Sequence, residues 1–491
     1  MIHGELSRSR FPRLVIAGLS GDAGKTLVSL GVTLALRARG LDVRGFKKGP
    51  DYIDAAWLSW ASGRPARNLD SWIAGFDRVA ASFLRHAAAD GVNLVEGNRG
   101  VFDGVDAEGT HSTAALARTL DAPVILVVDA RKTTTTAAAC VLGAQSFDPS
   151  LRVRAVILNR VSGGRHEAVA REAIERRCGI RVLGAIPRLE GDSILPGRHL
   201  GLVTPEEHED ACRARQALLS LARQHLDLDG LLSIAAEGGK QLGAGEASTC
   251  GGSEEGPSAR PTIGYLRDSA FSFYYPDNLE ALEAAGASLL PISSLRGGPL
   301  PPGLDALYIG GGFPETHAAA LSANRTLLDS VGCAARDGLP IYAECGGLML
   351  LASALTWRGE RYRMAGVLPI DVEVCDRPAG HGYTALVVDR DNPFFAVGTA
   401  LKGHEFHYSR VAPSGDAGDH PATACAVTRG VGCGRGRDAL LHGNVWASYT
   451  HLHALGSPEW ATGIVQAAHR HAGDSRRTDE RPARLSVGWS R

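Results

Sequence analysis

Residues 18–26, GLSGDAGKT, place a lysine and a threonine at the end of a glycine-rich turn that follows an apolar run. A strand that leads through such a turn into a helix presents backbone N–H groups and the positive end of the helix dipole to an anion. In this setting Lys25 would reach the outer phosphates of a nucleotide, and the hydroxyl of Thr26 would bind Mg²⁺. Gly21 and Gly24 let the backbone approach phosphate closely. The segment therefore predicts a nucleoside triphosphate site.

The turn departs from the commonest phosphate-loop pattern, GxxxxGK[ST], because Leu19 stands where that pattern has its first glycine. Asp22 is also unusual, since an acid in an anion-binding turn is unfavourable unless it points outward or meets a cation. By itself the loop predicts a nucleotide but not the reaction in which the nucleotide takes part.

Charged residues follow the next apolar segments, in FKKGPDYID (46–54) and VEGNRGVFDG (95–104). The carboxyl ends of strands in an α/β sheet converge on one crevice. We therefore expect five side chains to face the phosphates: Lys47, Asp51, Asp54, Glu96 and Asp103. Carboxylates there would hold Mg²⁺, and a lysine would neutralise charge on a transferring phosphoryl group. Taken singly, each acid is equally well explained as a helix cap or a solvated loop residue.

Far along the chain, YAECGGLMLL (342–351) places Cys345 between an apolar strand and an apolar helix. A sharp strand-to-helix turn exposes a nucleophile and aims helix N–H groups at it, so we expect an exposed thiol with a lowered pKa. The alternative is a buried core cysteine. Of the nine cysteines, Cys345 alone has this context, and the absence of any CxxC pair argues against a zinc site.

A thiolate nucleophile needs an imidazole that is near in space rather than in sequence. His451 and His453 in ASYTHLHA (447–454) would lie on the same face of a strand late in the chain. The segment IGGGFPE (309–315) would supply backbone N–H groups for an oxyanion hole, at Gly311 and Gly312. Each histidine alone is as well explained by a structural role, so the assignment depends on the whole set.

The elements that must position these residues alternate along the chain. Apolar β-rich runs at 13–18, 92–96, 123–129, 153–158 and 182–186 are separated by helical stretches such as 25–39 and 112–120, which predicts a parallel α/β sheet. Residues 236–260 are rich in Gly, Ser and Glu, and the alternation restarts after them. We therefore predict a domain over 12–235, a linker over 236–260, a second α/β domain over 261–472 and a disordered tail over 473–491.

The 491 residues carry 52 basic and 53 acidic side chains, which offers no electrostatic case for nucleic acid or an anionic membrane as partner. No stretch approaches the roughly 20 apolar residues that a membrane span needs, and the first residues lack the apolar core of a signal peptide. We expect a cytoplasmic protein. The sequence leaves the oligomeric state open, with a homodimer as one candidate.

The loop spelling GxxxxxGKT resembles that of the dethiobiotin synthetase-like NTPases. GPDYID, GRPARNLDSW and VEGNRGVFDG resemble signatures of the cobyrinate a,c-diamide synthases. This resemblance implies a P-loop NTPase-like domain that binds ATP and Mg²⁺ through Lys25, Thr26 and Glu96, with Asp51 also near the metal. It further places four residues near the γ-phosphate and the substrate carboxylate: Lys47, Asp51, Asp54 and Asp103.

The same resemblance implies two further contacts in this domain. Asn159, in VILNRV, stands where relatives place an asparagine that contacts adenine, although a strand-end turn residue explains it nearly as well. Tyr52 and the segment 63–70 are implied as contacts of the substrate, together with Asp54.

Five segments after residue 260 resemble the class I glutamine amidotransferases that are fused to cobyrinate and cobyric acid synthases: DSAFSFYYPDNLEAL, LYIGGGFPE, YAECGGLM, GHEFHYS and ASYTHLH. By position His451 corresponds to the activating histidine. Many class I domains carry glutamate two residues later, where His453 stands here. A strict Cys-His-Glu triad is therefore not expected, and the role of His453 is open.

Together the two resemblances imply amide synthesis. Cys345 would release ammonia from L-glutamine, ATP would phosphorylate a substrate carboxylate, and ammonia would displace the phosphate. The implied substrate is a tetrapyrrole carboxylic acid, cobyrinate or a close relative, amidated on its a- and c-acetate groups. Siroheme, sirohydrochlorin and hydrogenobyrinate are alternatives.

Two other functional classes compete with amide synthesis. A regulatory or partitioning ATPase usually carries a second lysine in its loop, and none precedes Lys25 here. The second is a non-catalytic tetrapyrrole-binding protein, against which the intact set of reactive residues argues: Cys345, His451, Lys25 and Glu96.

Overall fold

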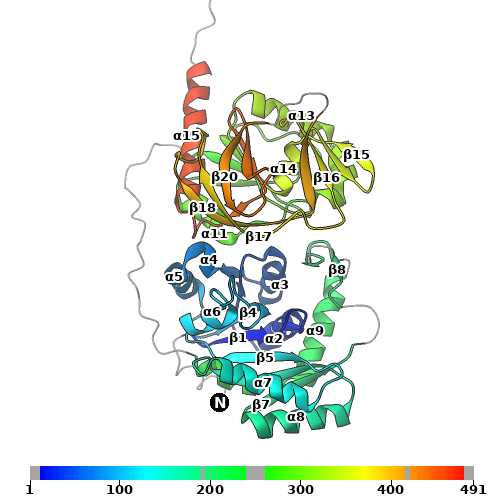
Figure 1. The fold of residues 1–491 in the computed structure, drawn as a ribbon. Coiled ribbons are helices and arrows are strands. Elements are labelled where there is room, and N and C mark those ends of the chain that lie inside the picture. The colour runs from blue at the N-terminus through cyan, green and yellow to red at the C-terminus, as the bar shows by residue number, and fades with distance from the viewer. Residues whose placement is uncertain are drawn as a thin grey trace, which may run out of the picture. The chain divides into compact units, whose positions relative to one another are not determined.

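The computed structural model describes residues 11–189, 194–198, 201–208, 210–238, 260–414 and 421–479, the last five without their side chains. The chain divides into two compact units, Met1–Gly251 and Gly252–Arg491. Each unit is an α/β fold (Figure 1). Most of the predicted linker, residues 239–259, lies outside the described residues, as does the predicted tail from 480 onward. Helix α15 continues to Asp479, so the predicted tail begins too early at 473.

Unit 1 is built on a seven-stranded sheet in the order β3-β2-β4-β1-β5-β6-β7, in which every pair is parallel. Its strands read as nearly continuous apolar runs because both faces of the sheet are covered by helices. The strands are β1 (Arg13–Gly18), β2 (Val43–Lys48), β3 (Arg67–Leu69), β4 (Val92–Gly100), β5 (Val124–Asp129), β6 (Val153–Val161) and β7 (Arg181–Pro187). A separate short pair is formed by β8 (Gly197–Arg198) and β9 (Gly201–Leu202).

The helices of unit 1 fall into two layers. Their bounds are α2 (Lys25–Ala38), α3 (Tyr52–Ser62), α4 (Ser71–Ala74), α5 (Phe76–His86), α6 (Thr113–Thr119), α7 (Thr135–Phe147), α8 (Gly164–Cys178), α9 (Ala211–His225) and α10 (Leu228–Ala236). Helix α2 packs against α3, α9 and α10. Helices α5 to α8 share one apolar core with the other face of the sheet. From β1 to β3 the chain moves toward one edge of the sheet, and from β3 to β7 it moves toward the other edge. Because crossovers between parallel strands are right-handed, the connecting helices of these two parts cover opposite faces of the sheet.

Unit 2 contains a ten-stranded sheet in the order β11-β10-β12-β13-β22-β21-β20-β17-β18-β23 and a four-stranded sheet, β15-β14-β16-β19. Strands β11 to β22 of the larger sheet are parallel, as predicted, whereas the strands beyond β22 are antiparallel, which the sequence pattern did not indicate. The strands are β10 (Thr262–Leu266), β11 (Ser288–Ile292), β12 (Ala306–Ile309), β13 (Ile341–Glu344), β14 (Ala354–Trp357), β15 (Glu360–Arg363), β16 (Ile370–Val374), β17 (Gly380–Val388), β18 (Ala400–His407), β19 (Ser409–Pro413), β20 (Thr423–Arg429), β21 (Arg437–His442), β22 (Val445–Ser448) and β23 (His451–Leu452).

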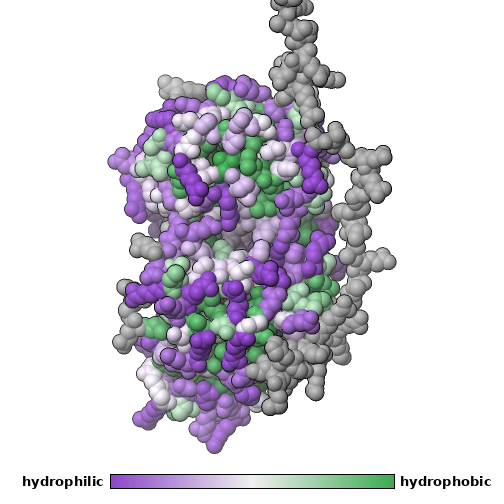
Figure 2. All heavy atoms as spheres, turned by 180° about the vertical axis from the view of Figure 1, so that it is seen from behind, coloured by the Kyte–Doolittle hydropathy of each residue, from purple (hydrophilic) through white to green (hydrophobic). Residues whose placement is uncertain are grey.

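The larger sheet of unit 2 separates two apolar cores, one that includes α13 and α14 and one that includes α11 and α15. The helical elements are α11 (Pro276–Ala284), η1 (Pro314–His317), α12 (Ala318–Ala323), α13 (Arg325–Arg336), α14 (Gly346–Leu351) and α15 (Glu459–Asp479). On the faces of the two units visible in Figure 2, hydrophilic residues cover much of the surface and apolar residues show in smaller areas. Within the described ranges, no helix has the length and apolar character needed to cross a bilayer.

Candidate functional site

The glycine-rich turn of unit 1 has the predicted strand-turn-helix arrangement. It leaves β1 at Gly18 and enters α2 at Lys25, with Gly24 as the N-cap at φ 98°. An added Cβ at Gly24 would lie 2.1 Å from Nδ2 of Asn159, so only glycine fits there. The Lys25 ammonium donates to the backbone oxygens of Ser20 (3.1 Å) and Arg99 (2.8 Å). Burial lowers the pKa of Lys25, and the neighbouring charge of Lys47 adds to this effect.

Asn159 and Arg160, at the end of β6, both donate hydrogen bonds to the backbone of the turn. The buried amide of Asn159 donates from Nδ2 to the backbone oxygen of Ala23 (2.8 Å), so it fixes the turn in place. Its predicted contact with adenine stays a prediction. Asp22 is exposed, and Arg160 donates to its backbone oxygen (2.7 Å). The charge of Asp22 acts on Lys25, where it favours the charged form of the ammonium.

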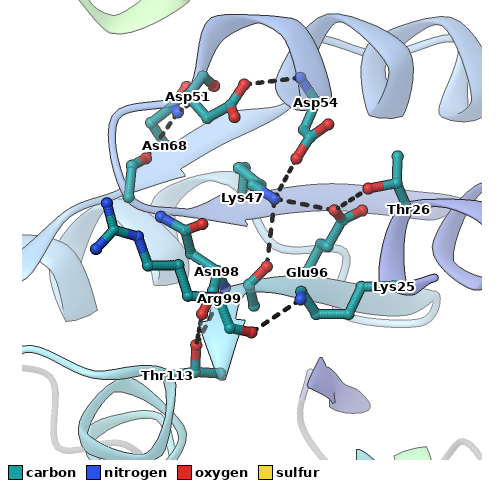
Figure 3. Close-up of polar contacts among 12 residues, drawn as sticks. Lys25, Thr26, Lys47, Asp51, Asp54, Asn68, Glu96, Asn98, Arg99 and Thr113 are labelled. Atoms are coloured by element: carbon teal, nitrogen blue, oxygen red, sulfur yellow. Dashed lines mark hydrogen bonds and ion pairs between the residues drawn. The ribbon is translucent and has the colours of Figure 1, made fainter. Parts of the chain in front are cut away.

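Thr26, Glu96, Lys47 and Asp54 form a continuous chain of contacts (Figure 3). The Thr26 hydroxyl donates to Glu96 Oε1 (2.8 Å), which also accepts from the Lys47 ammonium (2.9 Å). The same ammonium donates to Asp54 Oδ2 (2.5 Å) and to the backbone oxygen of Gly97 (3.2 Å). Four elements supply these groups, since Thr26 lies on α2, Lys47 on β2, Asp54 on α3 and Glu96 on β4. The predicted convergence at the carboxyl edge of the sheet is present for these residues.

The charges of this chain of contacts compensate one another. Burial alone would lower the pKa of Lys47, but Asp54 and Glu96 outweigh it and raise that pKa, so the lysine stays charged. Burial raises the pKa of the Glu96 carboxyl, and the charge of Lys47 opposes that rise. A buried lysine between two carboxylates is therefore a fixed positive charge at the edge of the sheet.

The remaining predicted residues of unit 1 lie around this chain. Asp51 caps α3 by accepting from the Asp54 backbone N–H (2.9 Å), and burial together with Asp54 raises its pKa to about 6. Tyr52 is the first residue of α3 and is half-buried. Asp103 does not join the chain, because its carboxylate accepts from the Gly100 N–H (2.8 Å) in the turn after β4. Its place near the γ-phosphate stays a prediction.

The residues predicted to bind Mg²⁺ fit a hard cation. Within the described ranges, Glu96 Oε2 is buried without a hydrogen-bond partner, while Oε1 already holds Thr26 and Lys47. Oxygen ligands suit Mg²⁺, which usually keeps several waters and takes only one or two carboxylates plus phosphate oxygens. The described residues contain no cluster of three or more His, Cys, Asp or Glu side chains that could bind a metal by themselves.

In unit 2, Cys345 occupies the turn between β13 and α14, with φ 47° and ψ −97°. Its backbone N–H donates to the oxygen of Ser448 (2.7 Å) on the adjacent β22. This strained conformation matches the predicted nucleophile turn. The expected exposure and lowered pKa are wrong, however. The residue is only 6% exposed, and burial, with the charge of Glu315 adding to it, raises the pKa of the Cys345 thiol despite the Gly346 N–H.

The glycine loop after β12 packs directly against this turn. An added Cβ at Gly346 would lie 3.1 Å from the backbone nitrogen of Gly312, and one at Gly311 would lie 2.5 Å from Cε1 of His451. The loop therefore lies between the nucleophile turn and the histidine. Gly311 and Gly312 thus lie close to Cys345 and His451, and their role in an oxyanion hole stays a prediction.

His451 begins β23 and faces a carboxylate that the sequence did not indicate. Its Nδ1 lies 3.5 Å from Oε2 of Glu344, the residue before Cys345. Glu344 is fully buried, and its carboxylate accepts from Tyr308 (3.3 Å), Tyr342 (3.2 Å) and the backbone N–H of Leu452 (3.1 Å). These contacts fix the carboxylate beside the imidazole. The sequence did contain one indication of this role for Glu344, because an acid ends the otherwise apolar strand β13, IYAE.

His453 lies in different surroundings. Its Nδ1 accepts from the Leu455 N–H (3.2 Å), its ring packs 4.4 Å from that of Tyr275, and its Nε2 lies 4.0 Å from Asp277 Oδ2. The His451 ring instead stacks on His404 at 5.0 Å. Burial lowers the pKa of His404 well below its usual value, so that ring is neutral. Both imidazoles therefore lie near a carboxylate, but His451 is the closer to its acid, at 3.5 Å from Glu344 compared with 4.0 Å between His453 and Asp277.

Comparison with known proteins identifies one domain in each unit. Residues 14–203 match the CobQ/CobB/MinD/ParA nucleotide binding domain, and residues 262–459 match the CobB/CobQ-like glutamine amidotransferase domain. A cobyrinate a,c-diamide synthase of Magnetococcus marinus is 44% identical over 92% of this chain and 96% of its own length. One of Syntrophotalea carbinolica is 41% identical over 92% of this chain and 98% of its own length.

A solved glutamine amidotransferase structure is more distant, with 20% identity and a TM-score of 0.32 over 42% of this chain and 98% of its own. The relatives and the two domain matches confirm the predicted family, the predicted α/β domain types and the predicted type of enzyme, a glutamine-dependent ligase. The chain therefore belongs to the cobyrinate a,c-diamide synthase family.

Proposed function

We propose that this protein converts the a- and c-acetate carboxylates of cobyrinate, or of a closely related tetrapyrrole, into amides, with ATP and L-glutamine as co-substrates. The observation that carries the proposal is the chain of contacts from Thr26 through Glu96 and Lys47 to Asp54 beside the phosphate loop. A carboxylate is a poor acyl donor until it is phosphorylated, and a fixed cation beside bound phosphates favours that transfer.

In unit 1, the substrate carboxylate attacks the γ-phosphorus of ATP, the bond to the β-phosphate oxygen breaks, and an acyl phosphate and ADP form. Lys47 and Lys25 stabilise the negative charge that develops on the transferring group. Bound Mg²⁺, held by Thr26, Glu96 and Asp51, would supply further charge neutralisation. Ammonia then adds to the acyl carbon, phosphate leaves, and the amide forms after loss of a proton.

In unit 2, His451 takes the proton from the buried Cys345 thiol as the sulfur attacks the side-chain amide of glutamine. The Gly311 and Gly312 N–H groups stabilise the oxyanion, and His451 returns the proton to the leaving nitrogen. Ammonia departs and a γ-glutamyl thioester remains, which water hydrolyses to glutamate. Glu344 stabilises the protonated imidazole, because its carboxylate lies 3.5 Å from Nδ1.

The names of the similar proteins support cobyrinate as the substrate, in preference to siroheme, sirohydrochlorin or hydrogenobyrinate. A cytoplasmic location and a homodimer remain predictions. The test is to offer cobyrinate, hydrogenobyrinate and siroheme side by side with ATP, Mg²⁺ and glutamine, and to identify products by high-resolution mass spectrometry. We expect a diamide of cobyrinate and release of glutamate. Absence of any amide product and of glutamate with all three substrates would refute the proposal.

A further inference from the structure

Lys48 differs from its neighbour Lys47 in its partners. Both lysines are buried, at 6% and 2% exposure. Lys47 forms two ion pairs, whereas within the described ranges the Lys48 ammonium has no hydrogen bond and no ion pair. Its ammonium is not among the fully buried nitrogen atoms of the described residues, so it reaches the surface while the rest of the side chain is buried. A cation in that position at the carboxyl edge of a parallel sheet is typical of a ligand site.

The two lysines point to opposite faces of the sheet. Side chains alternate along a strand, so Lys48 shares the face of Phe46, whose ring packs 4.8 Å from that of Phe83 on α5. Lys47 instead faces α3 and the phosphate loop, where it meets Asp54 and Glu96. A group held by Lys48 is therefore a different group from the one that is phosphorylated beside Lys47.

The groups around Lys48 leave it available to an anion. The carboxylate of Asp70, whose charge acts on Lys48, accepts from the Trp72 and Ile73 N–H groups (both 2.9 Å) as the N-cap of α4. Arg99, at the end of β4, has an exposed guanidinium with no hydrogen bond or ion pair in the described part of the chain. Figure 3 shows that this guanidinium points away from Lys25 and Glu96. Burial lowers the pKa of Lys48, and the charges of Lys47 and Arg99 lower it further. The charge of Asp70 acts in the opposite direction.

We infer that Lys48 and Arg99 bind a second carboxylate of the polyacidic substrate, and thereby hold the macrocycle while another carboxylate is phosphorylated beside Lys47. The inference rests on the proposed function, because it requires a substrate with more than one carboxylate. A tetrapyrrole with acetate and propionate side chains meets this requirement. The side chains of Lys48 and Arg99 are positioning residues in this account, since neither meets the reacting atoms.

The test compares Lys48→Met and Lys48→Arg with Lys402→Met, which removes an exposed lysine of unit 2. Loss of one charge-assisted hydrogen bond predicts a rise in KM for cobyrinate of about ten- to hundredfold in Lys48→Met. The KM for ATP and the glutaminase rate stay unchanged, and Lys48→Arg restores part of the affinity. The thermal midpoint of Lys48→Met stays about equal, because methionine keeps a long apolar side chain and no hydrogen bond or ion pair of the described residues is removed.

An unchanged KM for cobyrinate in Lys48→Met, or an equal rise in KM for ATP, would overturn the inference. A fall in thermal midpoint with unchanged cobyrinate binding would assign Lys48 to folding alone and overturn it as well. Binding of cobyrinate without ATP, followed by quenching of tryptophan fluorescence, separates this inference from the proposed function. If the wild-type protein binds cobyrinate but forms no amide, the proposed function fails while the Kd of Lys48→Met still decides the inference. If the wild-type protein does not bind cobyrinate, the inference fails.

Discussion

Lys47 of unit 1 and Cys345 of unit 2 both stand at the carboxyl end of a buried parallel strand, but their surroundings differ in charge. Lys47 is charged and meets two carboxylates before any ligand binds. Cys345 is buried, and burial raises the pKa of its thiol, so in the proposed mechanism it reaches its reactive form by proton transfer to His451. The comparison shows that the charged groups of unit 1 are paired with one another, whereas the thiol of unit 2 lies in surroundings that favour its neutral form.

The largest expected effect separates the two units. Cys345→Ala removes the nucleophile, so glutamine-dependent amide synthesis should fall by at least about a thousandfold. Synthesis from added ammonium chloride should persist, since the contacts of Lys47 and Glu96 are untouched. Parallel rate assays with the two nitrogen sources make the measurement. Loss of both activities in a variant with an unchanged thermal midpoint would contradict the division of labour.

Glu96→Gln tests the charge network of unit 1. Its carboxylate accepts from Thr26 and Lys47, and the amide removes half of the negative charge that Lys47 meets. We expect a loss of about a hundred- to a thousandfold in synthesis from glutamine and from ammonia alike. Asp42→Asn, which alters only a surface ion pair with Arg44, is the matched control. A Glu96→Gln protein as active as this control would remove Glu96 from the active site.

Glu344→Gln tests whether unit 2 relies on a carboxylate beside His451. Orienting groups of this kind contribute about a hundredfold or more to the rate. We expect kcat for glutamine hydrolysis to fall by about that factor while KM for glutamine and ammonia-dependent synthesis change little. Tyr342→Phe, which removes one hydrogen bond to Glu344, should have a smaller effect of the same kind. Equal rates of glutamine hydrolysis for Glu344→Gln and the wild-type protein would show that His451 does not need the Glu344 carboxylate.

The smallest expected effect concerns pH. A raised pKa means that the Cys345 thiol carries less thiolate than an exposed cysteine at the same pH, and thiolate is the form that iodoacetamide alkylates. Without glutamine, alkylation of Cys345 should therefore lag behind that of the exposed Cys212 at neutral pH and should keep increasing above pH 9. Peptide mass spectrometry gives both rates from one sample. Equal rates at neutral pH would show that the thiol is activated before substrate binds.

Sequence patterns could predict the residues that local structure positions. The phosphate loop, Lys47, Glu96 and Asp54 lie on or shortly after the parallel strands β1, β2 and β4, which are neighbours in the sheet. Contacts made by distant pairing could not be foreseen in the same way. Glu344 and His451 are brought together because β13, β22 and the antiparallel strands that end at β23 form one sheet. The burial of Cys345 depends on the close packing of the glycine loop after β12, which turn chemistry alone does not reveal.

Lys48 illustrates a further limit. Lys47 and Lys48 are adjacent in FKKGPDYID, and the sequence pattern predicted a role for Lys47 alone. Which lysine meets Asp54 and Glu96 depends on the face of β2 from which each side chain leaves. The structure shows which face each lysine takes. The side chain of Lys48 is buried, and its ammonium has no hydrogen bond or ion pair among the described residues.

The central claim is that unit 1 activates a carboxylate by phosphorylation before ammonia from unit 2 reacts. Its most direct test uses cobyrinate whose carboxylate oxygens carry a heavy isotope, with unlabelled ATP, glutamine and Mg²⁺. Mass spectrometry of the released inorganic phosphate is the measurement. An acyl phosphate predicts one heavy oxygen in phosphate for each amide formed. Amide formation with phosphate free of the heavy isotope would contradict the account.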